Sequence, residues 1–412
     1  MNSALQSIAL AFTFAAFAAW INHKFIRLPN TIGIMLLALL LSLVLVILGA
    51  LGFPFLKEMA ASTIAELDFG EILMQGMLSF LLFAGALHVN FEDLAQQKRV
   101  IGLMATLGVV LSTFLIGSAS WLVFELLGFG VPFIYCLLFG ALISPTDPIA
   151  VLGILKQAGV AKSLETKITG ESLFNDGVGV VVFLVLLGIA TSGKDITLGN
   201  VALVFAEEAI GGALFGLLIG WITFVMLKSL DDYKVEVLLT LALVIGGYTF
   251  AQTIHVSGPI AVVVAGLLIG NMGRSLAMSD TTRSHLDSFW ELLDEILNAL
   301  LFVLIGLEML IISLQGQYLL AGVIMIPLVL FARFVSVGLS VTLLRPFRSF
   351  SPHAVKLMTW GGLRGGISIA LALSLPAFEG RDLLLTITYV IVVFSITVQG
   401  LTLGGLAKKL GG

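Results

Sequence analysis

Long apolar runs, rather than short alternating ones, dominate the hydrophobic pattern of this chain. An α-helix needs about 20 such residues to cross the roughly 30 Å hydrocarbon core of a bilayer. Continuous runs exclude a β-barrel, because barrel strands alternate apolar and polar positions. The pattern therefore predicts an all-α integral membrane protein with 13 transmembrane helices. The expected spans are residues 4–22, 31–52, 70–88, 99–126, 131–156, 168–192, 198–227, 235–254, 257–272, 289–313, 318–344, 354–376 and 383–407.

Composition and charge agree with this prediction. Of the 412 residues, 59% are hydrophobic and only 11% are charged, which is too few charges for a soluble surface. Lys and Arg accumulate in cytoplasmic loops. With the N-terminus outside and the C-terminus in the cytoplasm, sixteen of the 21 basic residues fall in inner loops and three in outer loops. The remaining two, Arg333 and Arg364, lie well inside segments, away from the segment ends. We therefore expect a multi-pass protein of a prokaryotic cell (inner) membrane in that orientation.

The thirteen segments divide into six, one and six. Segment 5 is interrupted by SPTDP, residues 144–148, and segment 12 by GGLRGG, residues 361–366. Interrupted helices at corresponding positions of two halves are typical of transporters built from inverted repeats, which bind their substrates at the bilayer midplane. The pattern predicts two inverted six-helix repeats, with discontinuous helices 5 and 12 that cross at the midplane.

The first break combines two prolines with an acidic residue. Pro145 and Pro148 lack backbone N–H groups and disfavour helical geometry in the residues before them, so the helix should unwind around Thr146. Within hydrocarbon, free carbonyl groups are tolerated only where protein, water or a cation satisfies them. Asp147 beside such oxygens suggests a site for a hard cation. The alternative is a simple proline kink with a neutral, hydrogen-bonded Asp147.

Segment 6 begins with GESLFND, which gathers polar side chains within two turns. At 100° per residue, Glu171 and Asn175 share one stripe of the helix, and Ser172 and Asp176 share the neighbouring stripe. All four should face one side, which indicates a cavity rather than lipid. Ionised carboxylates are costly at membrane depth, so such acids indicate a functional site.

Two arginines at membrane depth each require a partner. For Arg364 we predict an ion pair with Glu171, because this pairing leaves Asp147 and Asp176 free for a substrate. For Arg333, Glu308 is one possible partner, in a structural ion pair.

These three motifs resemble the signature of the electroneutral sodium/proton antiporters of cation/proton antiporter family 1, NhaP type. The motifs are TDP in a broken fifth helix, GESLFND in the sixth and GGLRGG in the twelfth, and the likeness covers the whole chain. The resemblance implies a homodimer. Helices 4–6 (residues 99–192) and 11–13 (314–412) would form the core transport domain. Helices 1–3 (1–98), with linker helix 7 and helices 8–10 (193–313), would form the interface or dimer domain.

The resemblance also implies roles for the site residues. Asp176 would be the carboxylate that binds the ion and the proton in turn. Asp147, Ser172 and the backbone of Thr146 would assist it, and Glu171 would reach the ion through water or pair with Arg364. Asn175 and Arg364 would be structural.

A single exchangeable acid predicts the charge balance of transport. The residue before Asp176 is the neutral Asn175, so one Na⁺ or Li⁺ exchanged for one H⁺ would move no net charge. The partners expected are monovalent cations, protons and the lipid bilayer, with no cofactor and no nucleic acid. K⁺/H⁺ exchange by the same mechanism and a passive cation channel remain alternatives. An enzyme is disfavoured, because Phe174 occupies the second glycine position of a GxSxG nucleophile motif.

Overall fold

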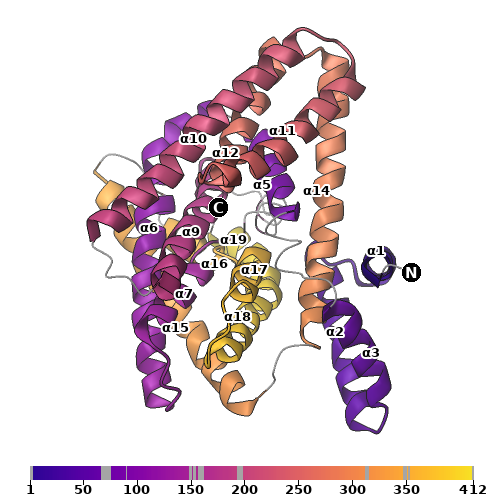
Figure 1. Cartoon of the computed structure of the whole chain (residues 1–412), viewed down its shortest axis with the longest axis vertical. Coiled ribbons are helices and arrows are strands. Elements are labelled where there is room, and N and C mark those ends of the chain that lie inside the picture. Colours follow the sequence, from indigo (N-terminus) through magenta and orange to yellow (C-terminus); the bar gives the residue numbers. More distant parts are fainter. Residues whose placement is uncertain are drawn as a thin grey trace.

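The computed structural model describes residues 3–65, 76–89, 91–147, 151, 155, 162–192, 198–310, 315–346, 350 and 353–410. Every regular element in this part of the chain is a helix, as the apolar pattern predicts (Figure 1). In chain order these are α1 (Ser3–Ile21), the π-helical turn η1 (Asn22–Ile26), α2 (Asn30–Ala50), α3 (Pro54–Ala65), α5 (Leu78–Leu87), α6 (Phe91–Leu126), α7 (Phe133–Ile143), α9 (Lys162–Ser192), α10 (Leu198–Lys228), α11 (Tyr233–Thr253), α12 (Gly258–Leu268), η3 (Ile269–Gly273), α13 (Arg274–Leu276), α14 (Asp280–Glu308), α15 (Gly316–Leu344), α16 (Ala354–Trp360), α17 (Gly366–Leu373), α18 (Arg381–Phe394), η4 (Ser395–Gln399) and α19 (Gly400–Leu410).

Nine helices of the described part are long and apolar enough to cross a bilayer. The other four expected segments have different forms. Residues 70–88 and 131–156 contribute the short helices α5 and α7, and residues 354–376 are divided between α16 and α17. The segment 289–313 corresponds to the second half of α14, whose first half is rich in charged residues. Helix α3 was not predicted as an element of its own.

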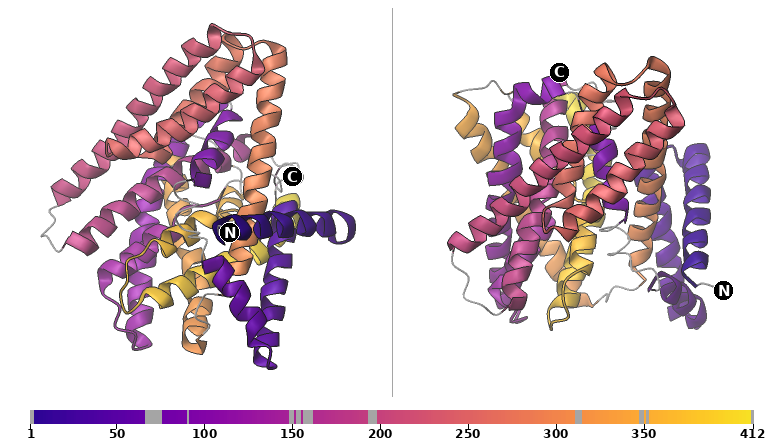
Figure 2. Two further views of the ribbon diagram at one scale, coloured as in Figure 1. Left: turned by 45° about the vertical axis from the view of Figure 1, so that its right-hand side comes forward. Right: turned by 45° about the horizontal axis from the view of Figure 1, so that its top comes forward.

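The helices form two groups that differ in their neighbours. Helices α6, α7, α9 and α15 lie beside the C-terminal helices α16–α19, whereas α10, α11 and α12 run together across the other end of the molecule (Figures 1 and 2). Helix α5 packs against α12, and α14 extends from the α11 end down to α2. The groups therefore meet along α5, α9, α14 and α17.

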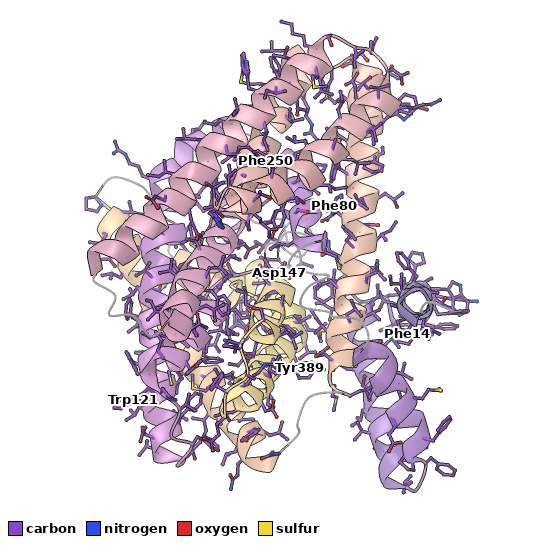
Figure 3. All side chains as sticks on the ribbon, viewed as in Figure 1. Phe14, Phe80, Trp121, Asp147, Phe250 and Tyr389 are labelled. Carbon is purple, nitrogen blue, oxygen red and sulfur yellow. The ribbon has the colours of Figure 1, made fainter. Side chains whose placement is uncertain are left out.

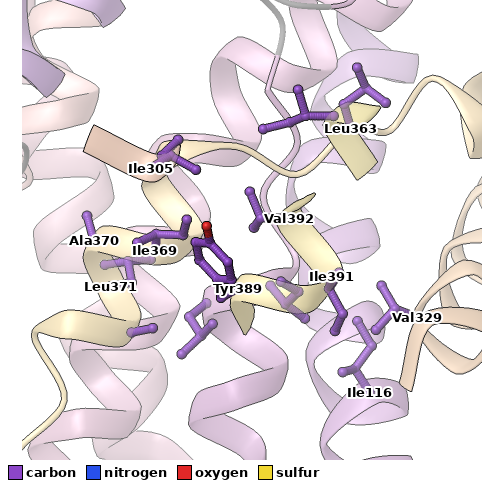
Figure 4. Packing of buried hydrophobic residues seen from close by; sticks show 14 of the residues in the cluster. Ile116, Ile305, Val329, Leu363, Ile369, Ala370, Leu371, Tyr389, Ile391 and Val392 are labelled. Atoms are coloured by element: carbon purple, nitrogen blue, oxygen red, sulfur yellow. The ribbon is translucent and has the colours of Figure 1, made fainter. Parts of the chain in front are cut away.

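Close packing of small residues holds the first group together. Gly140 of α7 faces the backbone of α6, where a Cβ atom would overlap the carbonyl oxygen of Thr113. Within a bilayer, small residues allow this approach, and van der Waals contact then stabilises the helix pair. Further along, Tyr389 of α18 packs among Ile369, Leu371 and other apolar side chains (Figure 4). This packed group supports the two broken helices.

Candidate functional site

The first break lies at the carboxyl end of α7. The helix ends at Ile143, and Pro145, Thr146 and Asp147 have no helical geometry. Pro145 cannot donate a backbone hydrogen bond, so the helix cannot continue through it. The predicted unwinding around Thr146 is confirmed, whereas Pro148 lies outside the described residues.

The second break meets the first. Helix α16 ends at Trp360 and α17 begins at Gly366, so the GGLRGG motif interrupts the helix as predicted. The backbone N–H of Asp147 donates to the carbonyl oxygen of Leu363 over 2.8 Å. Two segments that are more than 200 residues apart in the chain therefore satisfy each other's freed backbone groups.

Gly365 allows the two breaks to lie this close. A Cβ atom on Gly365 would collide with Oδ2 of Asp147 and crowd its Cβ and Cγ atoms. Only a residue without a side chain therefore leaves room for the carboxylate.

We expect Gly365→Ala to lower the thermal stability of the purified protein, because overpacking a tight site costs about 1–3 kcal/mol. Gly405→Ala is the matched control, since nothing lies within 4 Å of a Cβ atom there. The measurement is the midpoint of thermal unfolding in detergent. Equal midpoints for Gly365→Ala and the unsubstituted protein would contradict this account of the close contact.

The polar face of α9 is buried, as its helical spacing predicts. Glu171, Ser172, Asn175 and Asp176 are at most 3% exposed. Asp147 lies near the centre of the molecule (Figure 3). The four side chains therefore face protein rather than lipid.

Side chains of α9 hold the first break in place. The backbone N–H of Thr146 donates to Oδ1 of Asn175 over 3.1 Å, and Nδ2 of Asn175 donates to the Thr146 hydroxyl over 2.8 Å. This hydroxyl also lies 2.9 Å from that of Ser172. Sequence reasoning used Asn175 mainly for its lack of charge and missed these two hydrogen bonds, because they require the contact between α9 and the break.

A cavity of about 50 Å³ adjoins both breaks. Asp147 and Asp176 both line it, which is the juxtaposition that the sequence motifs predict. This volume suits a water molecule or a small cation. The other lining residues are Leu78, Leu81, Leu82 and Gly85 of α5, Pro145, Leu173, Leu301 of α14, and Gly365, Gly366, Ile367 and Ser368.

The predicted Arg364–Glu171 ion pair is wrong. The Arg364 guanidinium donates instead to the carbonyl oxygens of Ser144 and Pro145, the latter over 2.8 Å. Its backbone N–H donates to the hydroxyl of Ser395 in η4. The carboxyl end of a helix carries partial negative charge on unpaired carbonyl groups. Arg364 therefore satisfies the oxygens that the proline break leaves free.

Arg333 of α15 is the partner of Glu171. The two side chains form a bidentate pair with N···O distances of 2.5 and 2.9 Å, and both are almost fully buried. The suggested pairing of Arg333 with Glu308 is therefore also wrong, because Glu171 occupies the Arg333 guanidinium. The sequence predicts that Arg333 is a buried charge that needs a partner. It does not predict that Arg333 lies on the face of α15 that contacts α9.

Comparisons with known proteins agree with the motifs. A family model described as "Sodium/hydrogen exchanger, transmembrane" matches residues 12–409. The chain is 52% identical to the Na(+)/H(+) antiporter NhaP of Pseudomonas aeruginosa, over 98% of this chain and 97% of that protein. It is 37% identical to the Na(+)/H(+) antiporter NhaH of Halobacillus aidingensis, over 99% and 97% of the two chains.

A solved structure supports the fold. The sodium proton antiporter of Methanocaldococcus jannaschii at pH 8 superimposes with a TM-score of 0.78 and covers 99% of both chains. The sequences are 22% identical, so this similarity shows a shared fold.

Proposed function

Since this chain belongs to the sodium/hydrogen exchanger family, we propose that it is a secondary transporter that exchanges Na⁺ or Li⁺ for H⁺ across the membrane. The family consists of multi-pass membrane transporters and not of enzymes. The observation that carries the proposal is the cavity at the crossing of the two breaks, because Asp147 and Asp176 line it together. The names of the related antiporters support the same function.

In this proposal Asp176 binds the cation and the proton in turn. Asp147, Ser172 and Thr146 supply further oxygen ligands, which suit a small hard cation. The burial of Asp176 and its position on the cavity wall support its role. Glu171, which the resemblance also allows as a ligand through water, has its carboxylate engaged by Arg333. Its role in the proposal is therefore to hold α15 against α9.

Competition for one carboxylate would produce obligatory exchange. A bare carboxylate is costly to move through a medium of low dielectric constant, so the site would cross between the two aqueous sides only with a cation or a proton bound. With the neutral Asn175 before Asp176, the exchange would be one Na⁺ for one H⁺ and electroneutral. Alternating exposure of the site to the two sides completes the mechanism.

The architecture proposed for this mechanism follows the sequence motifs. It has 13 transmembrane helices in two inverted six-helix repeats, with the N-terminus outside and the C-terminus in the cytoplasm. Residues 99–192 and 314–412 form the transport core, residues 1–98 and 193–313 form the interface domain, and two chains associate as a homodimer. The meeting of the two broken helices supports the repeat, because each half supplies one break.

Everted membrane vesicles provide the test of this function. After respiration has acidified the vesicles, added Na⁺ or Li⁺ is expected to dissipate the pH gradient, as read by a pH-sensitive dye, and K⁺ is expected to have little effect. Clamping the membrane potential with valinomycin and K⁺ should leave the Na⁺-dependent rate unchanged. A flux that follows the voltage without reciprocal proton movement would identify a channel and overturn the proposal, and a response to K⁺ alone would identify K⁺/H⁺ exchange.

A further inference from the structure

Helix α14 carries the polar side chains of Asp294 and Asn298 on the stripe that faces the protein interior. The stripe follows helical spacing through Leu286, Trp290, Asn298 and Leu301, which are all buried. Asp294 lies one turn after Trp290 and one turn before Asn298, so it belongs to the same stripe. Trp290 packs against Phe83 of α5 with ring centroids 4.7 Å apart. The stripe is therefore directed toward α5, which supplies one wall of the cavity.

Both polar side chains have an oxygen atom that lacks a hydrogen-bond partner. Oδ1 of Asp294 and Oδ1 of Asn298 are inaccessible to solvent and accept no hydrogen bond. Asn298 is only 3% exposed. Leaving a buried acceptor without a hydrogen bond is unfavourable. The two side chains lie one turn apart on the same helix face, so a single ligand could reach both oxygen atoms. Because both atoms are acceptors, only a hydrogen-bond donor or a cation can satisfy them.

The position of these atoms connects them with the cavity. Leu301, three residues after Asn298, lines the cavity together with Asp147 and Asp176. Asp294 is close enough to Asp147 for the charges of the two carboxylates to interact. Helix α14 begins between the basic residues Arg274 and Arg283, which the positive-inside pattern assigns to the cytoplasm. Asp294 and Asn298 therefore lie between the cytoplasmic end of α14 and the central carboxylates.

We propose that Asp294 and Asn298 form a second, transient site for a small hard monovalent cation or a protonated water molecule, on the route between the cytoplasm and the cavity. This inference rests on the function proposed above. The carboxylate of Asp294 attracts the cation, and the amide oxygen of Asn298 replaces part of its hydration shell. Repulsion from a cation bound at Asp147 and Asp176 keeps the occupancy of the second site transient.

The test compares Asp294→Asn with Glu295→Gln in everted vesicles. Glu295 is adjacent on the same helix but exposed, so its substitution removes the same charge outside the stripe. For Asp294→Asn we expect the KM for Na⁺ added to the cytoplasmic face to rise about tenfold, as for the loss of one charged ligand. The KM at the opposite face, measured in right-side-out vesicles, and the maximal rate should change by less than about twofold. Glu295→Gln should behave as the unsubstituted protein.

The possible outcomes separate this site from the proposed function. An absence of Na⁺-dependent proton movement in the unsubstituted protein would overturn the function itself. Three results would overturn only the second site. They are normal exchange in Asp294→Asn, an equal shift of KM for Na⁺ at both faces in that variant, and the same shift of KM in Glu295→Gln. If Asp294→Asn fails to accumulate, Asn298→Ala replaces it with the same expectation for KM, and an unchanged cytoplasmic KM then rejects the site.

Discussion

Replacing Asp176 by Asn is expected to reduce Na⁺-dependent proton movement to the background of vesicles that lack the protein. Asn has nearly the same volume as Asp, so the buried position on α9 should remain filled. The amide, however, neither binds a proton at physiological pH nor supplies a negative charge to a cation. If Asp176 is the group for which the two ions compete, both halves of the exchange cycle are lost together.

The measurement is dye-monitored exchange in everted vesicles, combined with size-exclusion chromatography to show that the variant inserts and folds. Glu207→Gln is the control, because Glu207 is an exposed carboxylate on α10, a neighbouring helix. Its substitution should leave exchange unchanged. Coupled exchange that survives in Asp176→Asn would reject the role of Asp176, whatever the stability of the variant.

Replacing Arg333 by Met is expected to destabilise the protein by about 3–5 kcal/mol, the usual cost of leaving one member of a buried ion pair without its partner. Glu171 would then retain a buried carboxylate beside apolar α15. Adding Glu171→Gln removes this charge, so the double variant should recover much of the lost stability. The recovery is the sign of a direct interaction between the two residues.

The measurement is thermal unfolding in detergent of four proteins: the unsubstituted protein, Arg333→Met, Glu171→Gln and the double variant. Together they form a double-mutant cycle. Asp280→Asn is the control, because its side chain is 98% exposed and its ion pair with Arg283 lies at the surface. An exposed pair contributes about 0–1 kcal/mol, so this change should have little effect. If the effects of Arg333→Met and Glu171→Gln simply add, the bidentate pair does not contribute to stability.

The sequence predicts the local structure of the site well, because proline and glycine act within a few residues of their positions. Pro145 ends α7, and Gly361 and Gly365 bracket the break before α17. The shared side of Glu171, Ser172, Asn175 and Asp176 on neighbouring stripes of one helix follows from helical spacing alone. These features need no knowledge of which helices are neighbours.

The pairing of the arginines could not be predicted in the same way. A buried guanidinium needs acceptors, but both carboxylates and free carbonyl groups satisfy it, and the choice depends on how the helices pack. Arg364 lies across the end of α7 and takes carbonyl oxygens, whereas Arg333 reaches Glu171 from α15. Likewise, the orphan oxygens of Asp294 and Asn298 are visible only once α14 is packed against α5. In each case the missing information is tertiary contact.

The wall of the cavity that α5 and α14 supply consists of Leu78, Leu81, Leu82, Gly85 and Leu301, with no polar side chain among the residues that line it. The opposite side carries the carboxylates and is tied together by hydrogen bonds between the two breaks and α9. A shear displacement of one side along the other would therefore disrupt only dispersion contacts at this lining, which are individually weak and readily re-formed. The boundary between the two sides is thus suited to sliding, and the hydrogen-bonded side is suited to moving as a rigid body.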